Sequence, residues 1–306
     1  MRIGLNYFNI NPAYRGGINT YTLGLTEGFA AVNKTHQFNI FVKEKAVSMF
    51  EKFTNTSNIK IIPVKDISSL KYNLRKGSIV FASKGIYRSV CNSFYKEVCE
   101  IINANSDLVY TPTTILFPYM ISKPTVISMH DVQQFHYPEF FSKAELLSRK
   151  IHFGLSADMV THIQASSRFI KQDLLQHFTV LKPEQITVIP EGVDIDLFAK
   201  EKETKYLNDK YNLPKEFLFF PAQLWLHKNH ITVLKAIKQI ELTQNKKIPL
   251  VLTGAKESAA KQIFSFVEEN KMDYVHYLGV VPFEDILALY KRAKFLITGV
   301  LYESSS

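Results

Sequence analysis

The stretch Ile186-Thr187-Val188-Ile189-Pro190-Glu191-Gly192-Val193-Asp194 (ITVIPEGVD) divides the sequence into two parts. Its first four residues are apolar or β-branched and predict a buried strand. After Pro190 the pattern changes, and a polar, charged stretch continues through Tyr211. We therefore expect a crossover here between two domains, residues 1–193 and 194–306.

On both sides of this stretch, short apolar runs alternate with segments of helical spacing. The predicted strands are 2–8, 37–42, 108–111, 125–129, 159–164 and 186–189, followed by 217–221, 249–253, 275–278 and 295–298. The predicted helices are 18–32, 142–155, 167–178, 230–241, 257–270 and 283–292. Because alternating strands and helices specify a parallel sheet covered on both faces, we expect an α/β fold in each domain.

Composition and charge narrow the class of protein. With 306 residues, of which 46% are hydrophobic, the chain can fill two cores at roughly 100–200 residues per domain. Lys and Arg number 37 against 28 for Asp and Glu, and the net charge of +9 favours anionic partners such as phosphates or acidic lipids. No nucleic-acid-binding module is recognisable, so we expect no nucleic-acid partner.

The first candidate site is Gly16-Gly17, between the first predicted strand and the first predicted helix. Paired glycines let the backbone approach an anion, and the following helix start presents free N–H groups. An ordinary tight turn explains the pair equally well. No third glycine completes the G-x-G-x-x-G fingerprint, which weakens an NAD(P)-binding interpretation.

The second candidate is His130, which with Asp131 follows the predicted strand 125–129. Open α/β sheets bind their ligands at the carboxyl ends of the strands, and imidazole can donate or accept a hydrogen bond near neutral pH. A structural histidine bonded to backbone is the alternative. Four other histidines of the first predicted domain are weaker candidates for a site residue. They are His136, His152, His162 and His177.

The third candidate is the loop from Gln223 to His230, after the first predicted strand of the second domain. Lys228 lies at or just before a helix start, where its charge and the helix N–H groups can converge on a diphosphate. His227 and His230 have no further ligand nearby, so zinc is not expected there. We predict no metal site and no cofactor. Glu303 follows the last predicted strand and could bind sugar hydroxyls, although a lone exposed Glu is most often only solvated.

A basic stretch runs from Lys65 to Lys96, with seven basic residues against one acidic residue and several interleaved aromatics. Such a surface can bind an anionic membrane, and a solvated helix face is the simpler alternative. The first eight residues enter a strand pattern directly, so no signal peptide is predicted, and no apolar run is long enough to span a membrane. We expect a cytoplasmic protein, with possible peripheral attachment to the inner face of the membrane.

Taken together, these motifs resemble those of the retaining glycosyltransferases of family 4, which have the GT-B fold. The resemblance rests on segments that occur in the family's order, listed next. They are Gly16-Gly17, Ile127 to Asp131, Ala165 to Phe169, Val188 to Asp194, Gln223 to Asn229, Val251 to Gly254 and Pro282 to Glu303. The similarity is greatest to mannosyltransferase-like members that build surface polysaccharides.

The resemblance implies two Rossmann-like domains facing a cleft, the first on the acceptor side and the second binding a nucleotide-sugar. It implies that Gly16 and Gly17 contact the donor diphosphate, that His130 lies beside the transferred sugar, and that Lys228 neutralises the leaving nucleotide. Transfer would retain the anomeric configuration, without a metal, from a nucleotide-sugar to a saccharide or lipid-linked acceptor. The sugar would be a hexose, with mannose suggested by the mannosyltransferase-like members.

Two features depart from the family's pattern. Gln223 stands where the family commonly has an arginine, five residues before the lysine, and this removes one positive charge from the donor site. A Glu-x7-Glu signature beginning at Glu303 would need a second Glu at position 311, beyond the end of the sequence. We therefore expect an incomplete second domain. The alternative function is a catalytically silent fragment that binds a partner or a membrane.

Overall fold

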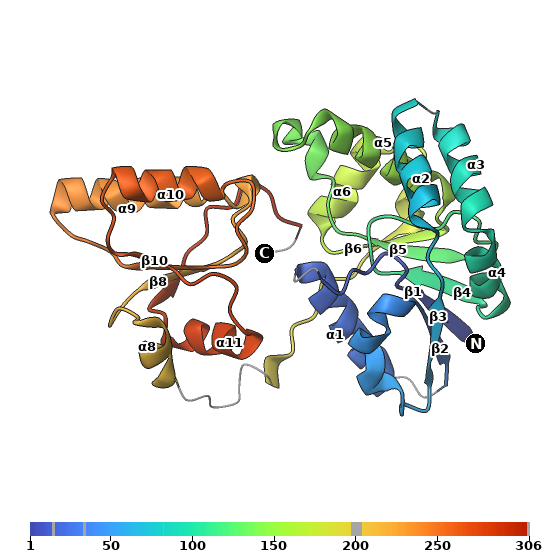
Figure 1. Ribbon diagram of the computed structural model, residues 1–306, viewed down its shortest axis with the longest axis horizontal. Helices are drawn as coiled ribbons and strands as arrows, with labels where there is room; N and C mark the ends of the chain where they lie inside the picture. The colour runs from blue at the N-terminus through green and yellow to red at the C-terminus, as the bar shows by residue number, and fades with distance from the viewer. Residues whose placement is uncertain (14–15, 33–34, 82, 197–203, 305–306) are drawn as a thin grey trace. The chain divides into compact units, whose positions relative to one another are not determined.

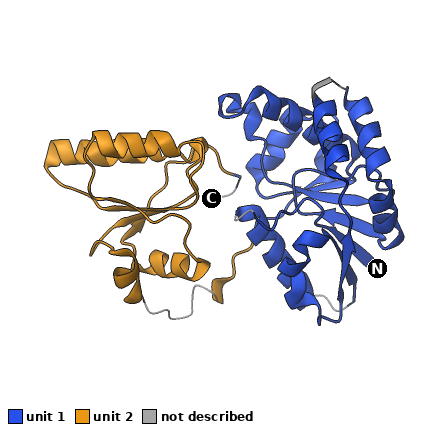
Figure 2. Cartoon of the chain, viewed as in Figure 1, with its two compact units in different colours: residues 1–191, 304–306 blue, residues 192–303 orange. Residues whose placement is uncertain are grey.

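The computed structural model of the protein describes residues 1–13, 16–32, 35–81, 83–196 and 204–304. It divides into two compact units, residues 1–191 with Ser304 and residues 192–303 (Figure 2). The division falls between Glu191 and Gly192, within the ITVIPEGVD stretch. None of the described helices combines the length and the apolar composition that a bilayer span requires.

Unit 1 is built on a seven-stranded parallel sheet in the order β3-β2-β1-β4-β5-β6-β7 (Figure 1). Its strands are β1 (Arg2–Asn6), β2 (Gln37–Lys43), β3 (Ile59–Val64), β4 (Leu108–Thr111), β5 (Thr125–Met129), β6 (His162–Ala165) and β7 (Ile186–Val188). Its α-helices are α1 (Gly17–Val32), α2 (Ser69–Phe81), α3 (Lys84–Phe94), α4 (Lys96–Ala104), α5 (Lys143–Met159) and α6 (Arg168–His177). The 3₁₀ helices are η1 (Glu44–Phe53), η2 (Gln133–Phe135), η3 (Pro138–Phe140) and η4 (Pro183–Gln185).

The sheet of unit 1 is apolar on both faces. In β2, Phe38 and Ile40 pack into one core with side chains of η1 and α1, whereas Phe41 packs into the other with side chains of α3, α4 and α5. Successive side chains of a strand point to opposite faces, so this single strand contributes to both cores. The continuous apolar run of β2 is typical of a parallel sheet covered by helices on both sides.

Unit 2 repeats this arrangement on a smaller scale, with a four-stranded parallel sheet in the order β10-β9-β8-β11. The strands are β8 (Leu218–Pro221), β9 (Leu250–Thr253), β10 (Val275–Tyr277) and β11 (Phe295–Leu296). The helices are α8 (Tyr206–Tyr211), η5 (Leu226–Lys228), α9 (His230–Gln244), α10 (Ala260–Glu269) and α11 (Phe283–Arg292). Figure 1 shows α9 and α10 on one face of this sheet and α8 and α11 on the other. Both faces are therefore covered, as the prediction of an α/β fold required.

The helix starts agree with the capping signals in the sequence. The hydroxyl of Ser167 accepts a hydrogen bond from the Ile170 N–H at the start of α6. Ser142 and Glu145 form a reciprocal capping box at the start of α5. Each cap satisfies N–H groups that the first turn of a helix leaves without partners.

Several elements were missed or misplaced by the sequence analysis. The edge strand β3 contains Pro63 and was not expected. Helices α2 and α3 lie in the stretch described only as basic, α8 lies in the polar stretch, and α4 lies where no element was expected. Met159, predicted to begin a strand, instead ends α5, and β6 begins at His162. The strand predicted over 295–298 is limited to Phe295–Leu296, and both of its residues are exposed.

Candidate functional site

The carboxyl ends of the strands in unit 1 bring two of the predicted segments together. His130 follows β5 directly, and its ring contacts Tyr21 of α1 edge to face, with centroids 5.0 Å apart. Tyr21 lies one helical turn from Gly17, the first residue of α1. The start of α1 and the loop after β5 therefore form one region of unit 1.

Gly17 is placed where a ligand has room. A Cβ atom at this position would meet no heavy atom of the described chain within 4 Å, so packing does not demand a glycine here. The carbonyl of Gly16 accepts hydrogen bonds from the N–H groups of Asn19 and Thr20, which begins the helix. Open space beside a helix start suits an anionic ligand, and the assigned contact of Gly16 and Gly17 with a diphosphate stays a prediction.

Both ring nitrogens of His130 are engaged by oxygen acceptors. Nδ1 lies 3.0 Å from Oε1 of Glu191, and Nε2 lies 3.0 Å from the carbonyl oxygen of Pro112. A carbonyl oxygen can only accept, and an ionised carboxylate can only accept, so both nitrogens must carry protons in this arrangement. The geometry therefore favours the imidazolium form of His130.

The pKa of His130 agrees with this description. Burial would lower the pKa, but the hydrogen bonds to Glu191 and Pro112 and the nearby charge of Asp131 outweigh it and raise the pKa above its ordinary value. Both N–H groups of this cation already donate, so it can donate to developing negative charge only by releasing Glu191 or Pro112. It cannot act as a general base until it loses a proton. Glu191 belonged to the ITVIPEGVD stretch, but its pairing with His130 was missed by the sequence analysis.

A buried polar network lies beside His130. The hydroxyl of Tyr21 contacts the hydroxyls of Tyr110 and Ser128 at 3.1 and 3.3 Å and donates to Oε1 of Gln164 at 3.0 Å. Nε2 of Gln164 donates to the Ile189 carbonyl at 2.7 Å. Because each polar group has a partner, the network fixes the position of the Tyr21 ring against His130. Buried Ser128 and Gln164 interrupt otherwise apolar strands, and that signal could have revealed the network.

A cavity of about 480 Å³ adjoins these loops within unit 1. Ile18 and Asp131 line it beside the region just described, and its two cationic residues are Arg75 and Arg149. The Arg149 guanidinium donates to Oε1 of Gln134 at 3.0 Å and lies 3.5 Å from Oδ1 of Asp131. The cavity therefore combines an apolar wall with two guanidinium groups.

Arg75 carries its charge without a carboxylate partner among the described residues. Its guanidinium lies over the rings of Tyr72 and Phe117, at 5.2 and 5.1 Å from their centroids, and its buried Nε makes no hydrogen bond in the described part of the chain. A half-buried cation with an unused donor, placed in a cavity wall, favours an anionic ligand.

Six of the seven basic residues from Lys65 to Lys96 are exposed, and Arg75 is the one that is partly buried. Arg75 lines the cavity, Lys71 lies over the Phe94 ring, and Lys84 pairs with Asp158. The exposed part also presents Leu70 and Ile86, which are 71% and 59% exposed. Binding of this stretch to an anionic membrane stays a prediction.

In unit 2, the loops that follow β8, β9 and β11 pack together. A Cβ atom at Gly254 would come within 2.6 Å of the Ala222 carbonyl oxygen, and one at Gly299 within 2.8 Å of the Asn229 carbonyl oxygen. Gly254 also has φ of +122°, which side-chain-bearing residues rarely adopt. The Asn229 side chain donates to the Gly299 carbonyl at 2.9 Å. These close approaches hold the three loops in one cluster.

Lys228 and Glu303 meet in this cluster. Nζ of Lys228, at the end of η5, forms an ion pair with Oε1 of Glu303, and both side chains are partly exposed. The structure thus brings together two residues that are 75 positions apart and that were predicted separately. The resemblance assigns a phosphate oxygen as the partner of this ammonium, and that assignment stays a prediction.

Gln223 lies in the same loop but is turned toward Trp225. Its Oε1 accepts a hydrogen bond from the indole N–H at 2.8 Å.

His230 packs in the core, with its ring stacked on Phe220 at 4.2 Å, and burial lowers its pKa to about 4. His230 is therefore a neutral core residue. His152 has the same character: it is buried beside Tyr87 and Tyr119.

The predicted site residues fall into two groups, one in each unit. Gly16, Gly17 and His130 share a region of unit 1, and Gln223, Lys228 and Glu303 share the loop cluster of unit 2. Their assigned roles in catalysis and donor binding stay predictions. Of the weaker candidates, His136 and His177 meet at Asp173 in unit 1.

Comparison with known proteins identifies the family. The profile of Glycosyltransferase Family 4 matches residues 15–197, and that of Glycosyl transferases group 1 matches residues 203–305. The O-antigen chain mannosyltransferase B of Escherichia coli is 20% identical over 290 residues, covering 94% of this chain and 73% of that protein.

Solved structures with the same fold are numerous. Anabaena HepE in complex with UDP and glucose matches 98% of this chain and 74% of its own, with a TM-score of 0.67 at 16% identity. WaaG, a glycosyltransferase involved in lipopolysaccharide biosynthesis, matches 99% of this chain and 76% of its own, with a TM-score of 0.65 at 13% identity. The α/β fold and the expected GT-B architecture are confirmed, and the chain belongs to glycosyltransferase family 4 and is a glycosyltransferase.

Proposed function

We propose that the protein transfers a hexose, with mannose the first candidate, from a nucleotide-sugar to a saccharide or lipid-linked acceptor during the building of a surface polysaccharide. Family membership supports the transferase over a silent binding module. The E. coli relative is an O-antigen chain mannosyltransferase, WaaG is involved in lipopolysaccharide biosynthesis, and HepE binds UDP and glucose. The observation that carries the proposal is Lys228 at the loop cluster of unit 2, in the part that matches the group 1 profile.

In this proposal the leaving diphosphate is stabilised by charge and by N–H groups rather than by a metal ion. Lys228 exchanges Glu303 for a phosphate oxygen, and the start of α1 offers N–H groups to the same kind of ligand. The cationic form of His130 exchanges the Pro112 carbonyl for an oxygen of the transferred sugar, to which its Nε2–H then donates. The configuration is retained because the acceptor approaches on the face that the diphosphate leaves, and a diphosphate oxygen takes the acceptor's proton.

Donor-dependent turnover tests the proposal directly. Purified protein is incubated with a panel of nucleoside-diphosphate sugars that includes GDP-mannose and UDP-glucose, with and without saccharide acceptors. We expect release of the nucleoside diphosphate from one donor, and NMR of the product should show the anomeric configuration of that donor. Absence of both transfer and donor hydrolysis across the panel would contradict the proposed function, and an inverted product would contradict retention alone.

We further propose that the cavity of unit 1 takes an acceptor that carries an anionic group, such as a phosphate-linked saccharide. Replacing Arg75 by methionine keeps an unbranched stem against Phe117 but removes the charge. Loss of a hydrogen bond to a charged group costs about 1.5–3 kcal/mol, so the KM for an anionic acceptor should rise roughly tenfold or more. The KM for the donor should stay unchanged.

The exposed Arg88 of α3 offers a matched control, since Arg88→Met removes the same charge from the same basic stretch. Steady-state kinetics with a phosphorylated acceptor and its neutral analogue make the comparison. If Arg75→Met and Arg88→Met behave alike, or if both acceptors are affected equally, Arg75 does not recognise the anionic group.

A further inference from the structure

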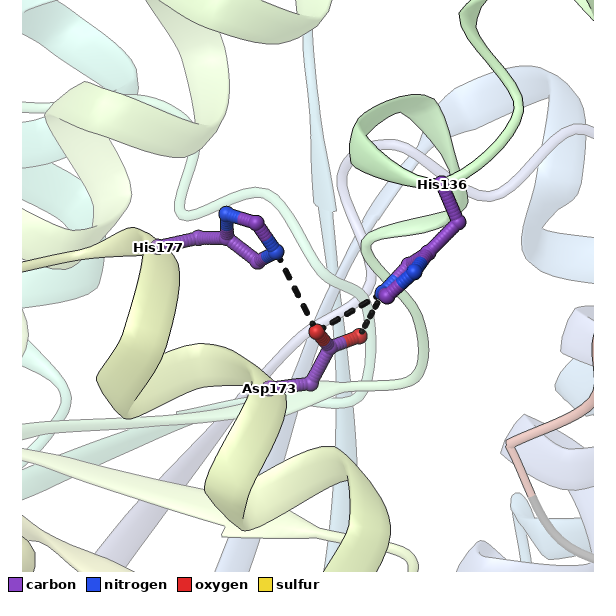
Figure 3. Close-up of side chains that lie close together, drawn as sticks. All are labelled: His136, Asp173 and His177. Atoms are coloured by element: carbon purple, nitrogen blue, oxygen red, sulfur yellow. Dashed lines mark hydrogen bonds and ion pairs between the residues drawn. The ribbon is translucent and has the colours of Figure 1, made fainter.

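Three side chains from two separate segments of the sequence converge at one point in unit 1 (Figure 3). Asp173 and His177 lie one turn apart on α6, and His136 comes from the segment between η2 and η3. Residues four apart on a helix share a face, so Asp173 and His177 are presented together. Their ligating atoms and that of His136 all lie within 4.8 Å of one another.

One distance within the cluster equals that expected around a shared ion, and the other two are shorter by about half an ångström. Nε2 of His136 is 2.8 Å from both carboxylate oxygens of Asp173, and Nε2 of His177 is 3.3 Å from Oδ1. Two ligands that each lie about 2.0–2.1 Å from a tetrahedral zinc ion are separated by about 3.3 Å. Small movements of the side chains would therefore admit a cation between the three groups.

The Nε2 atom of His177 lacks a well-formed hydrogen bond among the described residues. Nε2 is buried, yet in the described structure it makes no hydrogen bond of acceptable geometry, although it faces the Asp173 carboxylate. Without a proton, its lone pair would point at a negatively charged oxygen. With a proton, the donor would be poorly aligned. A divalent cation removes both difficulties, because it accepts the nitrogen lone pair and the carboxylate charge at once.

The surroundings hold the ligands in place. The Phe135 ring stacks on His177 with centroids 4.1 Å apart and an interplanar angle of 4°, which fixes the orientation of the imidazole. The Asp173 side chain is 3% exposed, whereas those of His136 and His177 are 33% and 21% exposed. The carboxylate of the cluster is thus buried, whereas its two imidazoles are partly open to water, which could supply a fourth ligand.

We propose that His136, Asp173 and His177 form a binding site for a divalent transition-metal ion, with Zn²⁺ preferred. Two imidazoles and a carboxylate suit zinc better than Mg²⁺ or Ca²⁺, which prefer all-oxygen sites. The ion would join the segment after β5, which begins with His130 and Asp131, to α6. This site is separate from the proposed donor chemistry, in which no metal takes part, and its role is to brace that segment.

Metal titration tests the proposal independently of transferase activity. Protein without a histidine tag is treated with EDTA, dialysed, and titrated with Zn²⁺ by calorimetry and with Co²⁺ by visible absorption. We expect one equivalent of tight binding and the strong absorption bands of four-coordinate Co²⁺. A hundredfold excess of Zn²⁺ over its Kd should raise the Tm by roughly 5 °C, because the ion binds only the folded protein.

Three variants test whether the bound Zn²⁺ lies at this cluster. Asp173→Asn and His136→Gln should each weaken Zn²⁺ binding by at least about tenfold, since changes even in outer-shell partners cost 10–100-fold. His162→Gln removes an imidazole of β6 outside the cluster and should leave binding unchanged. His136→Gln alters a partly exposed side chain and keeps the test valid if Asp173→Asn does not fold. Absence of stoichiometric binding, or equal affinity in His136→Gln and His162→Gln, overturns the proposal.

Discussion

Replacing Lys228 by alanine should lower kcat/KM for the nucleotide-sugar by about 10²- to 10³-fold, the usual loss when a preorganised charge-stabilising group is removed. The residue lies at the end of η5, where the loops after β8 and β11 meet, and its ammonium already binds a carboxylate. Because a diphosphate carries more negative charge than Glu303, the ammonium should transfer to it when the donor binds. The measurement is steady-state kinetics together with calorimetric titration of the nucleoside diphosphate.

Lys235→Ala is a matched control on the neighbouring helix α9, where Lys235 is exposed. Its kinetics should equal those of the unmodified protein. Glu303→Gln is a second useful variant, because it removes the carboxylate that competes with the diphosphate for Lys228. It should tighten binding of the free nucleoside diphosphate while transfer falls, if Glu303 also contacts the sugar as predicted. Unchanged nucleotide affinity in Lys228→Ala would exclude Lys228 from the donor site.

The strands could be predicted where the sequence contains a continuous apolar run. β2 could be predicted because Phe38, Ile40 and Phe41 fill the cores on both faces of a parallel sheet. β3 was missed because Pro63 and the charged Lys60 weaken the pattern of a strand that pairs on one side only. An edge position alone does not hide a strand, because the edge strands β7 and β10 were each predicted to within one residue.

The site was predictable only where local sequence determines chemistry. Lys228 and His130 follow strands and precede helices, so their positions at the carboxyl ends of the sheets could be inferred. The partners of these two residues could not be inferred. Glu303 is 75 positions from Lys228 and Glu191 is 61 positions from His130, and only the folded chain brings each pair together. The place of Arg75 in the cavity wall could not be predicted for a related reason. Its membership of a basic stretch said nothing of which side of α2 would face the cavity.

Replacing His130 by alanine should lower the rate of transfer by about 10²- to 10³-fold with little effect on nucleoside diphosphate binding, since its predicted contact is with the sugar. The more discriminating variant is Glu191→Gln. It removes the negative charge that holds the His130 pKa above its ordinary value, so the pKa of His130 should fall. An NMR titration of the His130 ring protons measures this shift, with His162 as the internal reference.

The sign of the pH effect follows from that shift. Because the pKa of folded His130 is raised above its unfolded value, the Glu191 contact stabilises the protein fully below the ordinary histidine pKa, and the contribution is lost as the pH rises through the raised value. Glu191→Gln should therefore lower the Tm most near pH 6 and least in the alkaline range. If the imidazolium is the active form, the fall in kcat with rising pH should begin at a lower pH in Glu191→Gln than in the unmodified protein. An identical pH profile in the two proteins would show that the charge on His130 takes no part in transfer and that Glu191 only holds the loop after β5.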